Sequence, residues 1–202
     1  MGGVEQEPGR GEVSDPGPGP LNLANALTAL RIVLAPIFLV LYVQGDRLRA
    51  LAAFAAAAAT DLLDGLVARV LRQQTRLGAF LDPIADKFLA ACALLALAAT
   101  GRLPFWLPAL VVSRDLAQLA GAAFLGTTHH SVPVAPTRIG KYATMALAVT
   151  VVLALADEFG ADPGGELGPF VIAFALLAAE CVAISFAQYS LFFVRAVRTP
   201  VR

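Results

Sequence analysis

Four aspartates between residues 61 and 86 have the types and spacing that most strongly suggest chemistry. Asp61 and Asp64 are separated by two residues, and Asp82 and Asp86 by three. Either spacing places both side chains of a pair on one side of an α-helix. All four lie in or beside long apolar segments, where one aspartate costs roughly 2.5–3.5 kcal/mol on insertion scales. We therefore expect a cation to offset the buried charge.

Six apolar stretches must position these residues. They cover residues 22–44, 48–71, 78–100, 104–125, 139–157 and 168–194. Each is close to the ~20 residues that cross a bilayer as a helix, and a backbone in hydrocarbon must satisfy its own hydrogen bonds. The chain is 58% hydrophobic and 15% charged. The sequence thus predicts an all-α integral membrane protein with six transmembrane helices, in one membrane domain covering residues 21–202.

The remaining composition narrows the function classes. Residues 1–20 are rich in Gly, Pro and Glu and lack the pattern of a signal peptide, so they are predicted to be a disordered N-terminal tail. A formal net charge of zero argues against nucleic acid as a partner. Cys92 and Cys181 lie in apolar stretches without metal-binding spacing and are interpreted as buried free thiols.

Basic residues gather on one side of the predicted bundle. At alternate connections and the C-terminus stand Arg69, Arg72, Arg76, Arg138, Lys141, Arg195, Arg198 and Arg202. The connection between the last two spans carries only acidic charges. The positive-inside rule then predicts cytoplasmic termini and a site that faces the cytoplasm. Arginine far outnumbers lysine and alanine is abundant, which favours a bacterial cytoplasmic membrane.

Helical geometry groups the acids with small residues. On the second predicted span, a sector about 100° wide contains Asp61, Asp64, Gly65 and Ala68. On the third span, a sector about 80° wide contains Gly78, Asp82 and Asp86. A short connection makes the two spans antiparallel neighbours, so the acidic faces are expected to meet. Carboxylate oxygens suit Mg²⁺ or Mn²⁺, and four carboxylates can hold two such ions.

The whole pattern, D-x2-D-G-x2-A-R-x8-G-x3-D-x3-D, resembles the signature of the CDP-alcohol phosphatidyltransferase family, with every signature position present. The likeness extends from Asn25 to about Arg195 and includes the opening Asn25-x-Leu27-Thr28-x-x-Arg31. The resemblance implies a six-helix enzyme, usually a homodimer, in which an acceptor hydroxyl displaces CMP from CDP-diacylglycerol within a lipid membrane.

The same resemblance implies roles for individual residues. Asp61, Asp64 and Asp82 would bind two divalent cations, Mg²⁺ or Mn²⁺, and Asp86 would share the second ion and act as the general base. The residues expected to bind the CDP-lipid are Asn25, Thr28, Gly65, Ala68, Arg69 and Gly78.

The acceptor site is less sharply indicated. Arg138 and Lys141 open the fifth span and suit the phosphate of a polyol phosphate or a lipid headgroup, although basic residues also flank cytoplasmic helix ends for topological reasons. Arg114 in the fourth span either joins the acceptor pocket or neutralises an aspartate. Since neighbouring helical residues do not face each other, Arg114 and Asp115 are expected to have separate partners.

The family resemblance implies two main acceptors, with inositol phosphate, serine and aminoalcohols as minor ones. Glycerol 3-phosphate, the acceptor of a phosphatidylglycerophosphate synthase, is expected first. Phosphatidylglycerol, the acceptor of a cardiolipin synthase, is the main alternative. In a different class, an ion-binding transporter also carries intramembrane acids, but the sequence shows no broken helices or inverted repeats. A non-catalytic structural relative is disfavoured by the intact set of acids.

Overall fold

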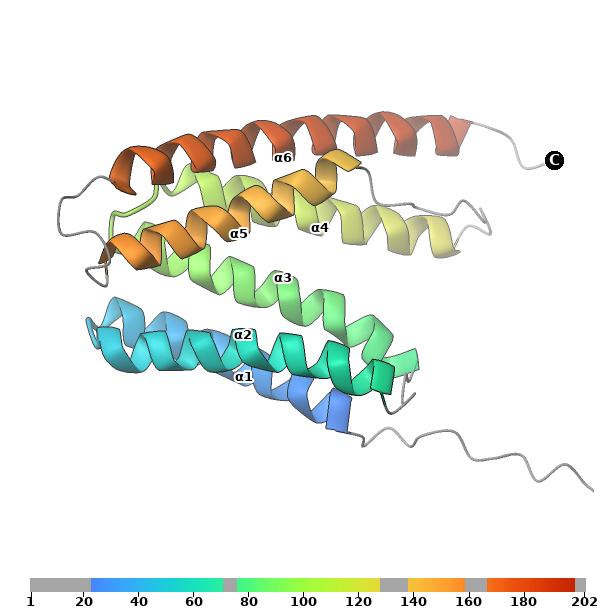
Figure 1. Ribbon diagram of the computed structural model, residues 1–202. Helices are drawn as coiled ribbons and strands as arrows, with labels where there is room; N and C mark the ends of the chain where they lie inside the picture. Colours follow the sequence, from blue (N-terminus) through green and yellow to red (C-terminus); the bar gives the residue numbers. More distant parts are fainter. Residues whose placement is uncertain (1–22, 71–75, 128–137, 159–166, 199–202) are drawn as a thin grey trace, which may run out of the picture.

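The computed structural model describes residues 23–70, 76–127, 138–158 and 167–198, which form six α-helices (Figure 1). These are α1 (Leu23–Val43), α2 (Arg47–Val70), α3 (Arg76–Ala99), α4 (Trp106–Thr127), α5 (Arg138–Glu158) and α6 (Leu167–Arg198). Within them, the side chains of residues 23–24, 62, 64–70, 76–80, 122–123, 125–127 and 195–198 are not described. The predicted tail, residues 1–20, lies outside the described residues.

Each predicted apolar stretch coincides with one helix to within a few residues, which confirms the all-helical expectation. Within the described residues, three helices are long and apolar enough to cross a membrane: Asn25–Val43, Arg138–Glu158 and Leu167–Val194. Charged residues lie within the other three helices, including Asp61 in α2, Asp86 in α3 and Arg114 in α4. The six helices and the three long apolar spans are consistent with a membrane protein.

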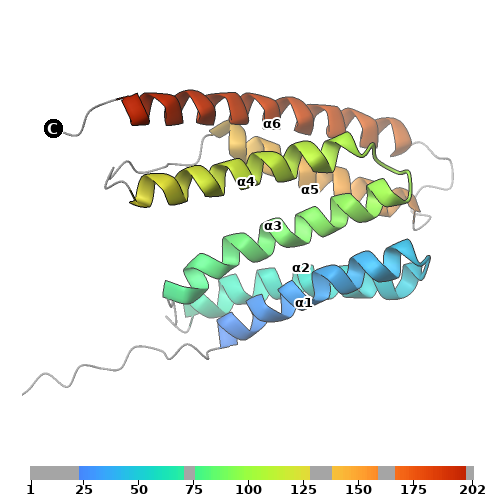
Figure 2. The same cartoon turned by 180° about the vertical axis from the view of Figure 1, so that it is seen from behind.

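The helices run up and down and divide into two groups joined by α3 (Figures 1 and 2). Helix α1 packs against both α2 and α3, while α5 packs against α6. Helix α4 contacts α6 and α3, and α3 also touches α5. In both views the first residues of α1, α3 and α5 lie at the same end of the bundle as the last residues of α2, α4 and α6.

The inward stripe of α1 changes character along the helix. Its buried residues recur every three or four positions, as one face of a helix requires. In chain order they are Asn25, Thr28, Arg31, Ala35, Phe38 and Tyr42. The first three are polar or charged, and the last three belong to the apolar core. Helix α1 therefore carries polar groups into one end of the bundle and seals the other end.

Helix α2 meets this stripe with small side chains. Ala50, Ala53, Ala57 and Thr60 are buried at helical spacing, and alanine lets two helix backbones approach closely. The run of alanines also favours the helix itself, because alanine has the highest intrinsic helix propensity. The same stripe leads directly to Asp61, so close packing of α1 and α2 brings that carboxylate towards the polar part of α1.

Tight turns terminate α1 and α3 at the opposite end of the bundle. Gly45 and Gly101 adopt positive φ angles of 85° and 76°. In each turn the glycine amide bonds a carbonyl three residues back and the next amide bonds one five residues back, a Schellman motif in which glycine avoids the Cβ penalty. Asp46 then caps α2 by accepting a hydrogen bond from the Arg49 amide, with 3.3 Å between Oδ1 and N.

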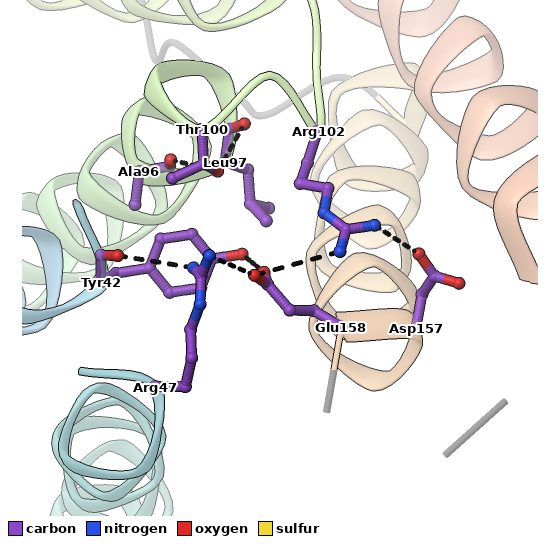
Figure 3. A network of polar contacts seen from close by, with 8 residues as sticks. All are labelled: Tyr42, Arg47, Ala96, Leu97, Thr100, Arg102, Asp157 and Glu158. Atoms are coloured by element: carbon purple, nitrogen blue, oxygen red, sulfur yellow. Dashed lines mark hydrogen bonds and ion pairs between the residues drawn. The ribbon is translucent and has the colours of Figure 1, made fainter. Parts of the chain in front are cut away.

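A polar cluster joins the two helix groups at this far end (Figure 3). The buried Glu158 carboxylate, at the end of α5, accepts a hydrogen bond from the Tyr42 hydroxyl of α1. Arg47 of α2 approaches Glu158 with 2.7 Å between Nη2 and Oε1, and its guanidinium lies 4.7 Å from the centre of the Tyr42 ring. Arg102 pairs with Asp157 at 2.9 Å and reaches Glu158 at 4.0 Å. The cluster holds α1, α2 and α5 together at the end of the bundle opposite the four signature aspartates.

Arg47→Ala is expected to destabilise the protein because it leaves the buried Glu158 carboxylate short of a cation. Arg47 is itself partly exposed, so we expect a loss of about 1–2 kcal/mol in the free energy of unfolding. Thermal unfolding in detergent measures this. Arg49→Ala, two residues along α2, is the matched control, because Arg49 is largely exposed and pairs only with nearby Asp46 among the described residues. Equal losses in the two variants would contradict the stabilising role of the cluster.

Candidate active site

A buried guanidinium links the two acidic helices. Arg31 of α1 contacts Asp61 of α2 with 3.0 Å between Nη2 and Oδ1. Its other terminal nitrogen, Nη1, lies 2.5 Å from Oδ1 of Asp86 on α3. One planar fork of donors therefore bridges carboxylates from two helices that both pack against α1. Asp61 and Asp86 are therefore joined through the side chain of a third helix. A direct meeting of the acidic faces of α2 and α3 stays a prediction, because α1 is the helix that packs extensively against both.

Burial differs sharply across this bridge. The Arg31 side chain is 0% exposed, whereas the side chains of Asp61 and Asp86 are 50% and 54% exposed. The Arg31 guanidinium is buried beneath the two carboxylates, which themselves reach an accessible surface. Such an arrangement holds acids in fixed positions while leaving them open to a ligand.

Helix α1 also contacts Asp82, the third signature aspartate whose side chain is described. The fully buried Thr28 hydroxyl donates a hydrogen bond to Oδ1 of Asp82, at 2.6 Å. Asn25, one turn earlier on the same stripe, is buried as well. The polar residues of α1 are thus directed at α3 by the helical repeat that also directs Arg31.

The remaining signature residues are placed only by their backbone. Asp64, Gly65, Ala68 and Arg69 lie on α2 and Gly78 lies on α3, but their side chains are outside the described residues. Among the side chains that are described, no three His, Cys, Asp or Glu residues form a group able to hold a metal ion. The described part of the site therefore pairs Asp61 with Asp86 through Arg31 and places Asp82 against Thr28.

A second charged network connects α3, α4 and α6. Arg114 bonds its sequence neighbour Asp115, with 2.8 Å between Nη1 and Oδ1. The expectation that these two residues do not face each other was wrong, because the long arginine side chain folds back to the adjacent carboxylate. Each also has the separate partner that was expected. Arg114 also donates to the Ser185 hydroxyl of α6 at 3.0 Å, and Lys87 of α3 approaches Asp115 at 3.2 Å. Asp115 thus contacts two basic residues, Arg114 and Lys87. The contacts of Arg114 agree with the alternative in which it neutralises an aspartate.

The two basic residues of α5 lie at the end of the bundle that carries the aspartates. Arg138 is the first residue of α5, and both Arg138 and Lys141 are exposed. Neither side chain forms an ion pair or hydrogen bond with any other part of the chain that the structure describes. In Figure 1 the start of α5 and the start of α3 lie at the same end of the bundle.

Comparison with known families covers the part of the chain that contains this site. The profile described as CDP-alcohol phosphatidyltransferase matches residues 21–186, which include the polar stripe of α1 and all four aspartates. The chain belongs to the CDP-alcohol phosphatidyltransferase family.

Individual relatives carry two kinds of name. A "Probable phosphatidylglycerophosphate synthase" from Mycobacterium tuberculosis is 46% identical over 101 residues, 47% of this chain and 48% of the relative. A "CDP-diacylglycerol--glycerol-3-phosphate 3-phosphatidyltransferase" from Yersinia pestis is 34% identical over 176 residues, 84% of this chain and 93% of the relative. A "Probable cardiolipin synthase (CMP-forming)" from Drosophila melanogaster is 36% identical over 152 residues, 67% of this chain and 47% of the relative. The match spans about half the length of the first and third of these relatives.

Arg31 is part of the opening motif that resembles the family, but no role was predicted for it from the sequence. It is the only charged residue between positions 23 and 43 of the chain. A lone charge in such an apolar helix is costly and requires a partner, which was the available signal. Its position three residues after Thr28 also places both on one helix face. Within the described part of this phosphatidyltransferase-family chain, the partners of Arg31 include two signature aspartates.

Thr28→Val tests how much the contact between α1 and Asp82 stabilises this end of the fold. Valine has nearly the shape of threonine but cannot donate a hydrogen bond, so Asp82 loses a charge-assisted partner. We expect a loss of about 1–2 kcal/mol in the free energy of unfolding, measured by thermal unfolding in detergent.

Thr150→Val is the matched control, because Thr150 is equally buried but its hydroxyl bonds the Ala146 carbonyl of its own helix. That carbonyl can keep its backbone partner, so a change of only a few tenths of a kcal/mol is expected. The same loss for both threonines would show that the Asp82 contact adds nothing beyond ordinary burial.

Proposed function

We propose that this protein transfers the phosphatidyl group of CDP-diacylglycerol to an acceptor hydroxyl and releases CMP. The observation that carries the proposal is the bridge from Arg31 to Asp61 and Asp86, which gathers signature carboxylates of two helices around one buried cation. Family membership and the names of the relatives support the same reaction class.

The donor set fits a pair of divalent cations. Asp61, Asp64, Asp82 and Asp86 offer hard oxygen ligands of the kind that Mg²⁺ and Mn²⁺ prefer. Asp61 and Asp86 already accommodate a positive charge between them and remain half exposed. When bound, such ions would neutralise the diphosphate and stabilise the departing CMP.

Asp86 is proposed as the general base. The acceptor oxygen forms a new bond to the phosphorus of the phosphatidyl group, and the bond between that phosphorus and the CMP oxygen breaks. The proton of the acceptor hydroxyl passes to the Asp86 carboxylate. Its 54% exposure gives the acceptor access, while its contact with Arg31 holds it in place.

The proposed remaining contacts follow the family pattern. Asn25, Thr28, Gly65, Ala68, Arg69 and Gly78 would bind the CDP-lipid. Arg138 and Lys141, exposed at the aspartate end, would bind the phosphate of the acceptor, and Arg114 would support that pocket from α4.

Glycerol 3-phosphate is the proposed acceptor, with phosphatidylglycerol as the alternative. Relatives named for the glycerol-3-phosphate reaction favour the first, and the Yersinia pestis relative matches over most of both chains. The relative named as a cardiolipin synthase keeps the second open. The paired basic residues of α5 suit a doubly charged phosphate monoester better than a diester headgroup.

The proposed setting is a bacterial cytoplasmic membrane crossed by all six helices, with both termini and the site on the cytoplasmic side and two chains forming a homodimer. The alternating basic connections support this orientation. Protease digestion of an N-terminal tag in inside-out vesicles tests this orientation: a tag cleaved only in right-side-out vesicles would contradict cytoplasmic termini.

Light scattering with correction for bound detergent would test the proposed homodimer, and a mass equal to one chain would contradict it.

The deciding experiment offers the purified protein CDP-diacylglycerol, Mg²⁺ or Mn²⁺, and a panel of acceptors. We expect CMP release that requires both metal and acceptor, with phosphatidylglycerophosphate as the lipid product. Cardiolipin formed from phosphatidylglycerol would select the alternative. If no acceptor yields metal-dependent CMP, the enzyme proposal fails.

The same assay tests the acceptor residues. Arg138→Ala removes a phosphate partner and should raise the KM for glycerol 3-phosphate about tenfold, as loss of a charge-assisted hydrogen bond implies. The KM for CDP-diacylglycerol should change little. Arg49→Ala, an exposed arginine at the far end, is the control. An unchanged acceptor KM would return Arg138 to a topological role.

Asp86→Asn should lower kcat by about 10²–10⁴-fold, the usual contribution of a general base, while CDP-diacylglycerol binding changes only a few-fold. Asp46→Asn at the far end is the matched control, because asparagine caps a helix as well as aspartate does and activity should persist. Wild-type turnover by Asp86→Asn would eliminate the assignment of Asp86 as the base.

A further inference from the structure

Arg31 combines three properties that a simple core residue does not need. Its side chain is completely buried, it stands alone as a charge on an apolar helix, and both terminal nitrogens of its guanidinium are engaged by different helices. Both contacts end on acids of the signature. Any shift of Arg31 therefore moves Asp61 and Asp86 relative to each other.

The shape of the guanidinium matters as much as its charge. Its donors form a rigid planar fork, so two carboxylates bound to Nη1 and Nη2 are held at a fixed separation and angle. A lysine ammonium has the same charge, but it is a single point on a flexible stem and cannot fix two partners in this way. A mere counter-charge could be either residue, whereas a spacer between two acids must be arginine.

We propose that Arg31 is a positioning residue of the transfer reaction, which sets the spacing of Asp61 and Asp86 from beneath so that both carboxylates are preorganised for divalent cations. The proposal rests on the function proposed above, since it assigns Asp61 and Asp86 to the cation site. Mutation of a residue that hydrogen-bonds to metal ligands and orients them commonly lowers metal affinity or activity 10–100-fold. Arg31 occupies such a position, because its buried nitrogens contact the half-exposed carboxylates.

The far end of the bundle provides an internal control. Arg102 also contacts two carboxylates, Asp157 at 2.9 Å and Glu158 at 4.0 Å, but in the cluster that only joins helices (Figure 3). Arg31→Lys and Arg102→Lys make the same chemical change in an arginine that contacts two acids. If arginine bridges merely stabilise this fold, the two variants should behave alike in every assay except in the size of the stability loss.

The test is Mn²⁺ binding, followed by the electron paramagnetic resonance signal of free Mn²⁺ in detergent-solubilised protein without lipid substrate. Arg31→Lys is expected to weaken Mn²⁺ binding about tenfold, in the range for residues that orient metal ligands. Arg102→Lys should bind Mn²⁺ as the wild type does. Arg31→Gln separates two explanations: a positioning role predicts weaker binding, whereas removal of a mere counter-charge predicts tighter binding of a cation.

Kinetics provide a second readout in the same variants. Displaced carboxylates should lower kcat for Arg31→Lys about 10–100-fold at saturating Mn²⁺. The KM for CDP-diacylglycerol should change less than threefold, because Arg31 lies beneath the acids and not in the accessible space. Arg102→Lys should retain both constants.

Loss of expression would not leave the proposal unresolved. If Arg31→Lys does not accumulate, the comparison becomes Asp86→Asn against Arg31→Gln/Asp86→Asn, in which one ion pair is removed as a unit and Asp61 is retained. Positioning predicts several-fold weaker Mn²⁺ binding in the double variant than in Asp86→Asn.

Two outcomes would overturn the proposal for Arg31 alone: wild-type Mn²⁺ affinity in Arg31→Lys, or equal affinity in Asp86→Asn and the double variant. A wild-type protein with no saturable Mn²⁺ binding would instead remove the metal-dependent function and the role of Arg31 together. The binding experiment needs neither acceptor nor CDP-lipid, so an error in the proposed acceptor does not affect its result.

Discussion

The compensation of a buried guanidinium by acids from two other helices is the interaction on which this structure depends. Helix α1 is apolar apart from its first turns, and an isolated charge there would cost roughly 2.5–3.5 kcal/mol on insertion scales. Two carboxylates offset that cost, and they come from α2 and α3, the two helices that pack on α1. The same contact that makes Arg31 tolerable in an apolar bundle brings Asp61 and Asp86 into one site.

The bundle separates stability from chemistry along its length. At the far end, Schellman turns at Gly45 and Gly101 and the cluster around Glu158 tie together α1, α2 and α5. At the other end, the stripe of α1 becomes polar and its partners are half-exposed acids. The buried polar residues of α1 lie on the same helix face as its core residues, so the packing of the core also determines where the polar residues lie.

Helix α3 couples the aspartate site to the rest of the molecule. It carries Asp82 and Asp86, and the next residue, Lys87, reaches Asp115 on α4. Asp115 is shared with Arg114, which extends to Ser185 on α6. The charged network therefore connects α3, which carries two of the acids, to α4 and α6 in the second helix group. Through this network Arg114 links α4 to α6, in addition to its proposed role near the acceptor.

The order of the helices, their boundaries and the family signature were all readable from the chain. Each of these is a local property, set by apolar length, helical period and the spacing of acids. The sequence also indicated which faces of α2 and α3 carry the aspartates, because residues three and four apart share a helix face. It did not reveal that Arg31 lies between them, nor that Arg114 turns back to Asp115. Those facts depend on the rotation of α1 between its neighbours and on side-chain conformations, which only the packing of three helices decides. The four aspartates alone predicted a cation site, and the tertiary structure shows that two of them contact a cation that the protein itself supplies, the Arg31 guanidinium.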